Sequence, residues 1–131
     1  MSQLAEGVVS SADKGSVVFS PAGTNYQLHL QAGTDVVTGP TTKGVITVKA
    51  RKVWTIPAGG SFMQPLVGSP RVVQGRVKAV EGGRLIVQAG TVVSVQLPAD
   101  PTALDLKNGP LVPGVMVNIT TFPDAGFALA R

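Results

Sequence analysis

The sequence predicts an all-β fold in which a small five-stranded barrel occurs twice in tandem. The first observation is a repeat: Glu6-Gly7-Val8-Val9 returns as Gln74-Gly75-Arg76-Val77. The second is the alternation of apolar and polar residues, which is the period of a β-strand. The third is composition, with 44% apolar residues, 14% charged residues, 16 Gly and 10 Pro. Because typical soluble domains are roughly 25% charged, this profile indicates a turn-rich β protein with little charged surface.

The repeat extends through most of the chain. Gly15-Ser16-Val17-Val18-Phe19 corresponds to Gly83-Arg84-Leu85-Ile86-Val87. We therefore predict a first barrel repeat over residues 5–63, an ordered Pro/Gly connector over 64–71 and a second barrel repeat over 72–131. A unit of this size is near the lower limit for a self-sufficient core, so we expect the two cores to depend on each other.

In the first repeat, alternation predicts a series of short strands and one long strand. They lie near residues 7–12, 16–20, 25–31 and 45–56, with a short last strand around Phe62-Met63. Asp13-Lys14-Gly15 separates the first two and is typical of a tight hairpin turn, because glycine adopts positive φ without strain.

The long strand has two distinct faces. Ile46, Val48 and Trp54 fall on an apolar face. Lys49 and Arg51 share the opposite face. Because Lys52 interrupts the apolar face, we expect a bend or bulge near Arg51-Lys52.

The second repeat has the same strand pattern with one helix added. Its strands are predicted near residues 72–80, 84–89, 92–97, 114–122 and 126–130. Glu81-Gly82-Gly83 forms the first hairpin turn. Asp100 is an N-cap candidate followed by a proline at the first helical position, and Asn108-Gly109-Pro110 would end the helix after one or two turns.

The order β-β-β-α-β-β is that of the oligonucleotide/oligosaccharide-binding (OB) barrel. The first repeat fits the same barrel without its helix. A β-sandwich is the competing architecture, because its strands alternate in the same way.

Two segments carry a resemblance to a known family. Val48-Lys49-Ala50-Arg51-Lys52-Val53-Trp54 resembles the terminal strand of the Mop/TOBE family of small OB-like modules, which often occur in tandem and bind molybdate. Leu104-Asp105-Leu106-Lys107-Asn108-Gly109 is similar to the family's short helix. The resemblance implies that Lys49 would hold an oxyanion. Arg51 stands where the family has a small hydroxyl residue, and the second repeat has no lysine in the equivalent strand.

The residues that support catalysis or metal binding are scarce. There is no cysteine, which excludes disulfides and thiolate metal sites. The single histidine, His29, alternates with two leucines and is expected to be an exposed strand residue. Asp100 is explained as a helix cap, and no serine has a histidine and an acid at a recognisable spacing. We expect neither enzymatic activity nor a cofactor or metal.

Positive charge is concentrated in the middle of the chain, whose net charge is +4. Such asymmetry is typical of proteins with an anionic partner, although exposed strands also need solubilising charge. The candidate contacts to an anion or nucleic acid are Lys49, Arg51, Lys52, Arg71, Arg76, Lys78 and Arg84.

Three functions fit these observations. The leading hypothesis is a non-enzymatic structural protein that assembles into a homo-oligomer, because low charge and open β-edges favour burial against partner subunits. The first alternative is an OB protein that binds nucleic acid, with Trp54 and Tyr26 as possible stacking platforms. Their positions among apolar residues favour the core instead. The second alternative is a protein that binds a small oxyanion such as molybdate.

The sequence also bears on location. No apolar run reaches the ~18 residues of a membrane span. The segment Met1-Ser2-Gln3-Leu4-Ala5-Glu6 has neither the basic nor the apolar region of a signal peptide. We therefore expect a cytoplasmic protein.

Overall fold

The computed structural model describes residues 4–130 and is all-β. Strands β1 to β6 are Ala5–Asp13, Ser16–Pro21, Gln27–Gln31, Thr42–Ile56, Phe62–Gln64 and Val67–Gly68. Strands β7 to β12 are Val72–Glu81, Arg84–Gln88, Val92–Gln96, Leu104–Asp105, Met116–Thr121 and Gly126–Leu129. Every strand that the sequence predicts is present, and the two-residue strands β6 and β10 are additional. Among the described residues, no helix is long and apolar enough to cross a membrane.

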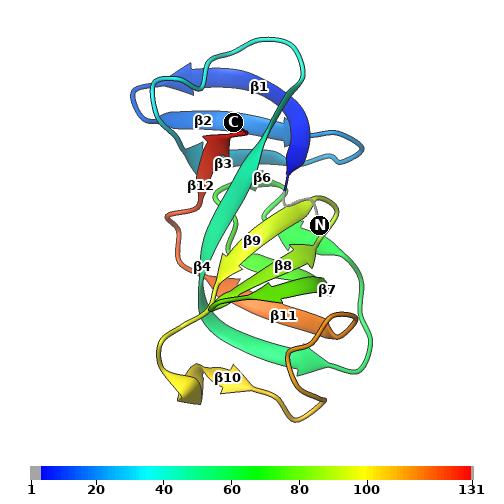
Figure 1. Cartoon of the computed structure of the whole chain (residues 1–131). Helices are drawn as coiled ribbons and strands as arrows, with labels where there is room; N and C mark the ends of the chain where they lie inside the picture. Colours follow the sequence, from blue (N-terminus) through cyan, green and yellow to red (C-terminus); the bar gives the residue numbers. More distant parts are fainter. Residues whose placement is uncertain (1–3, 131) are drawn as a thin grey trace.

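Strand pairing closes two rings of five strands that share β4. One ring runs β1-β2-β3-β12-β4 and returns to β1. The other runs β4-β11-β7-β8-β9 and returns to β4. Figure 1 shows β4 passing from the upper group of strands into the lower group. The open strand edges expected from the sequence are therefore largely paired within the chain.

Each ring contains a strand from the other repeat. β12 of the second repeat pairs with β4 through Phe127 and Ile46, and with β3 through Gly126 and Gln31, so it completes the first ring. The C-terminal part of β4 pairs with β11 and completes the second ring. Short β5 also crosses over and pairs with β7. The predicted connector at residues 64–71 thus separates the two copies of the sequence repeat. Strands from before and after this connector pair with each other in both rings.

The predicted irregularity in the long strand is a β-bulge. Thr120 pairs with Lys52, and the next residue, Thr121, pairs with Ala50. Arg51 is therefore the extra residue, which confirms the expected bulge.

The bulge reverses the faces of the strand beyond it. Val53 and Thr55 are buried, whereas Trp54 and Ile56 are only partly buried. The prediction that Trp54 belongs to the core is therefore wrong. An extra residue shifts a period-2 pattern by one position, so each later side chain moves to the opposite face.

The interiors of the two rings form one continuous apolar cluster. Phe19 and Phe127, from the two ends of the chain, have ring centroids 4.6 Å apart. The largest fully buried side chains are Phe19, Leu28, Leu30, Ile46, Met63, Leu85, Ile86 and Ile119. Because both repeats contribute to this cluster, the two cores share side chains.

The predicted helix is shorter than expected. Only Pro101–Ala103 form a 3-10 turn, and Leu104–Asp105 continue as β10, which pairs with β4. β9 pairs with β4 only as far as Lys49, so one edge of β4 is open at Val53 and Trp54. The short strand β10 pairs with this open edge in place of a longer helix.

Asp100 caps this turn as predicted. Its side chain accepts hydrogen bonds from the hydroxyl and the backbone N–H of Thr102 at 2.8 and 2.9 Å. These bonds lower the pKa of Asp100 below its ordinary value of 3.8. Because folding lowers this pKa, the stabilising contribution of the cap is present above the ordinary value and is lost as the pH falls through the folded-state value.

Tyr26 is a core residue, as predicted, and it joins the two rings. Its side chain is 6% exposed. Its hydroxyl donates to the Ala89 carbonyl at 3.0 Å and accepts from the Met63 N–H at 2.9 Å. Gly90 provides the necessary space, since a Cβ there would lie 2.6 Å from the hydroxyl oxygen.

We expect Tyr26→Phe to lower the free energy of unfolding by about 1–3 kcal/mol, because two backbone groups would be left buried without a partner. Denaturant unfolding followed by circular dichroism would measure the change. Ser16→Ala is a suitable control, since it removes an exposed hydroxyl bond to a backbone carbonyl and should cost less than about 0.5 kcal/mol. Equal stability of the two variants would contradict a joining role for Tyr26.

Candidate nucleic-acid interface

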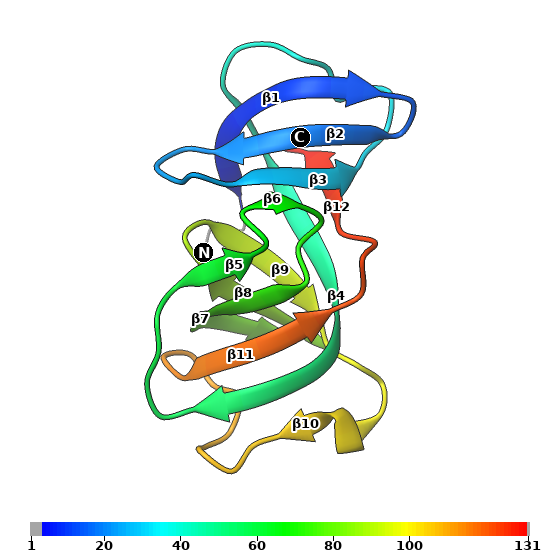
Figure 2. The same ribbon diagram turned by 180° about the vertical axis from the view of Figure 1, so that it is seen from behind.

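One row of side chains crosses β4, β11 and β7 of the second ring and the short strand β5, which pairs with β7. The pairing register places Trp54 of β4 opposite Asn118 of β11, Asn118 opposite Gln74 of β7, and Gln74 opposite Phe62 of β5. We call these four residues the aromatic row. Figure 2 shows β11 alongside the C-terminal part of β4 in the lower group of strands. Directly opposed residues have Cβ atoms about 4.5–5.5 Å apart, so neighbours in the row are within contact.

The aromatic row lies on the outer face of the ring. All four of its residues are partly exposed. The residues that alternate with them on the same strands are fully buried: Val53, Ile119, Val73 and Met63. The row is therefore a surface on which two aromatic rings stand at the ends and two amides lie between them.

Two predicted basic residues flank the row. Lys52 is exposed, and its Nζ lies 5.0 Å from the centroid of the Trp54 ring. Arg76 is exposed, and its guanidinium donates to the Gly114 carbonyl at 2.6 Å. Asp105 pairs with Trp54 at the β10 edge and supplies an acidic group there. The immediate surroundings of the row are thus more positive than negative.

Hydrogen bonds fix the amides in the row. The Gly60 N–H donates to Gln74 Oε1 at 3.0 Å. Gln74 Nε2 donates in turn to Asn118 Oδ1 at 3.0 Å. Both side chains are held against the sheet, so the surface is preorganised.

The other predicted basic residues do not join this surface as one patch. Arg51 is on the bulge, with its guanidinium carbon 5.5 Å from the centroid of the Phe122 ring. Arg71 precedes β7 and is exposed. Lys78 occupies the irregularity between Val77 and Ala79 where β7 pairs with β8. Of the seven predicted basic residues, only Lys52 and Arg76 lie beside the aromatic row, and a contact of these residues with an anion or nucleic acid stays a prediction.

A second row of polar residues lies on the far side of β4. Arg84 of β8 is opposite Gln96 of β9, and Gln96 is opposite Lys49 of β4. Arg84 donates to Ser94 Oγ at 3.0 Å. Neither β8 nor β9 carries an aromatic residue, so this row offers charge without a stacking platform.

Lys49 has an acidic partner. Its Nζ lies 3.2 Å from Asp124 Oδ2. The second carboxylate oxygen of Asp124 is buried, with no hydrogen-bond partner among the described residues. An oxyanion at Lys49 would have to approach this carboxylate, so the arrangement disfavours the oxyanion role that the family resemblance implies.

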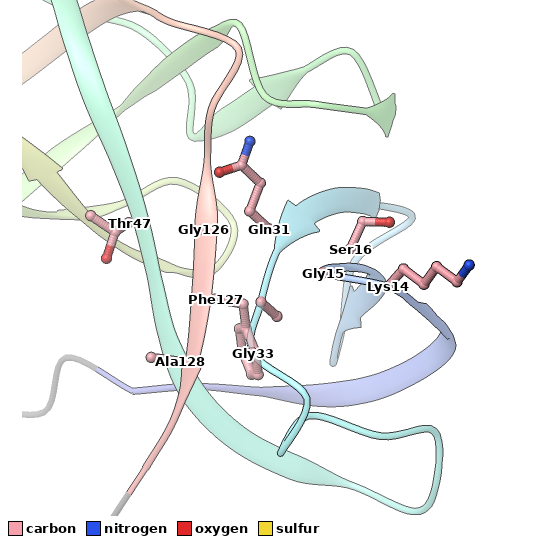
Figure 3. A pocket seen from close by; sticks show the side chains of 10 residues that line it. Lys14, Gly15, Ser16, Gln31, Gly33, Thr47, Gly126, Phe127 and Ala128 are labelled. Atoms are coloured by element: carbon pink, nitrogen blue, oxygen red, sulfur yellow. The ribbon is translucent and has the colours of Figure 1, made fainter.

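The first ring carries an open hollow of about 740 Å³ beside β12. Its lining includes Lys14, Ser16, Gln31 and Thr47, together with the backbone around Gly126. In Figure 3, Lys14, Gln31 and Thr47 point in different directions rather than toward a common centre. The hollow therefore does not present a converging set of ligands.

Several features of the site are missed by reasoning from the sequence. The sequence gives no functional signal for Phe62, Gln74 or Asn118, and its alternation predicts a buried Trp54. The available signal is the interruption of the apolar face at Lys52: a bulge near Arg51-Lys52 shifts the later positions of the strand by one and places Trp54 outside. His29 is exposed, as predicted.

Comparison with protein-family models, with curated proteins and with solved structures gives no match. Within residues 4–130, no group of three His, Cys, Asp or Glu side chains is placed to hold a metal ion.

Proposed function

We propose that this chain is a non-enzymatic protein that binds single-stranded nucleic acid through the aromatic row. The observation that carries the proposal is the pair of aromatic side chains, Trp54 and Phe62, on one sheet face. Lys52 and Arg76 lie beside them. Proteins that bind single strands combine aromatic stacking platforms with positive charge along the path of the backbone. The sequence pI of about 9.9 agrees with a polyanionic partner.

The same surface is poorly suited to self-association, the leading hypothesis from sequence alone. A twofold contact brings the same patch of two subunits together. It would therefore bring the Lys52 and Arg76 side chains of both subunits into one contact, where Asp105 is the acidic residue at the edge of the row. Like charges in such a contact oppose binding. Closure of both rings also removes most of the strand edges that favoured assembly.

We infer that each ring is an OB-type barrel. The support is the number of strands, the ring closure and the mostly antiparallel pairing. OB barrels commonly bind ligands on the face of their second and third strands. In the second ring these are β8 and β9, which carry no aromatic residue. We therefore place the contact on the face of β4, β11, β7 and β5 instead.

The size of the row indicates a short segment of ligand. Adjacent strands are about 4.8 Å apart, so three strand spacings separate the Trp54 and Phe62 side chains by about 14 Å. The bases of a segment of a few nucleotides that crosses the strands can stack on both aromatic side chains. The contact would be tolerant of sequence, because every base has a face that can stack.

Trp54 is the chain's single tryptophan, so its fluorescence reports directly on the proposed contact. We expect oligothymidine of about twelve nucleotides to quench this fluorescence at low salt, and added salt to reverse the quenching. Lys52→Gln combined with Arg76→Gln should weaken binding and reduce the slope of log affinity against log salt by about 1.4, since each phosphate contact to a single strand contributes about 0.7.

The matched control is Lys14→Gln combined with Lys43→Gln, which removes the same charge from exposed positions of the first ring. This control should leave the salt slope nearly unchanged. If both double variants behave alike, binding would be diffuse electrostatic attraction. If oligothymidine has no effect on the fluorescence at low salt, the proposed function is wrong.

A further inference from the structure

We infer that Asn118 gives the proposed site a preference for bases that carry a carbonyl oxygen at the contacted edge, such as thymine, uracil or guanine. This inference rests on the proposed function. It concerns which base is preferred beside Trp54, and it follows from the direction of the hydrogen bonds in the row.

A backbone donor sets that direction. The Gly60 N–H can only donate, so the Gln74 atom that it contacts must be the amide oxygen. The other end of the Gln74 amide is then a donor, and the Asn118 atom that it contacts must also be an oxygen. We call this chain of hydrogen bonds, from Gly60 through Gln74 to Asn118, the relay. It determines the orientation of both amides.

The remaining end of the Asn118 amide is its Nδ2, a donor with two hydrogens. No hydrogen bond joins this nitrogen to any residue that the structure describes. Asn118 is partly exposed and lies directly opposite Trp54. A base stacked on Trp54 would thus have an unpartnered N–H₂ group beside it.

An amide donor favours a carbonyl acceptor on the base and meets an exocyclic amino group, itself a donor, unfavourably. One hydrogen bond of ordinary strength corresponds to about a fivefold difference in affinity. The fixed orientation matters, because a freely rotating amide could present its oxygen to an amino base. Rotation of the Asn118 amide would break its hydrogen bond with Gln74, so the relay from Gly60 opposes this rotation.

Homopolymers of thymidine and 5-methyldeoxycytidine test this inference. Both bases carry the 5-methyl group. At position 4 thymine has a carbonyl and 5-methylcytosine has an amino group, and the neighbouring N3 carries a hydrogen only in thymine. We expect Trp54 quenching to show about fivefold tighter binding of oligothymidine. Equal, measurable affinities would overturn the inference and leave the proposed function standing. Absence of quenching by both oligomers would instead overturn the proposed function.

Gln74→Glu tests the relay itself. A carboxylate can still accept from the Gly60 N–H, but it cannot donate to Asn118, whose amide should then turn its nitrogen toward the carboxylate and its oxygen toward Trp54. The added negative charge should lower the affinities for both oligomers. The ratio of the affinity for oligothymidine to that for the 5-methyldeoxycytidine oligomer should fall to one or reverse. Gln64→Glu adds the same charge at an exposed position of β5 and should keep the original ratio. An unchanged ratio in Gln74→Glu would overturn the relay.

Discussion

Neither residues 1–68 nor residues 69–131 should fold as a stable monomer, and an equimolar mixture of the two should form a folded complex. The first fragment lacks β12, and the second lacks the part of β4 that pairs with β11. Each ring would be left with an open edge and an exposed apolar interior. Phe19, for example, would lose the ring of Phe127 as its neighbour.

Far-ultraviolet circular dichroism and size-exclusion chromatography would check this expectation. Each fragment alone should show no cooperative thermal transition or should aggregate, because unpaired strand edges and apolar surface drive association. The mixture should elute at the size of one intact chain and should melt cooperatively. A single fragment that remains monomeric and melts cooperatively would contradict the interdependence of the two cores.

Gly75→Ala should be among the most destabilising single substitutions, with a loss of about 3 kcal/mol in the free energy of unfolding. A Cβ at this position would lie 2.1 Å from the Gln88 carbonyl oxygen, so the backbone of β8 would have to move. Gly7, the equivalent residue of the first repeat, is similar, with 2.2 Å to the Ser20 carbonyl oxygen. The glycine repeated in the sequence therefore corresponds to the same close backbone contact in both rings.

Urea denaturation of Gly75→Ala would measure this loss. Gly39→Ala is the matched control, because no atom lies within 4 Å of a Cβ built there, and it should change stability by less than about 0.5 kcal/mol. Similar midpoints for the two variants would show that β8 can yield at little cost, contrary to the expectation.

The strand pattern was predictable because it depends on local alternation and on turn chemistry. Both hairpins form where expected, and their turn residues have positive φ, including Gly15 at 87° and Gly83 at 81°. The bulge at Arg51 was predictable because Lys52 breaks an apolar face. Its effect on Trp54 does not follow from alternation alone, since a period-2 pattern continues through a bulge unless the register is shifted.

The sequence by itself determined the all-β class of the fold, the position of nearly all of the strands and the burial of Tyr26. These depend on neighbouring residues and on the periodicity of a strand. Tertiary structure decided which strand completes which ring, because an alternating strand fits either partner equally well. It also decided the aromatic row. Asn118 lies 44 residues after Gln74 in the chain, and only the register of four paired strands brings it between Trp54 and Gln74.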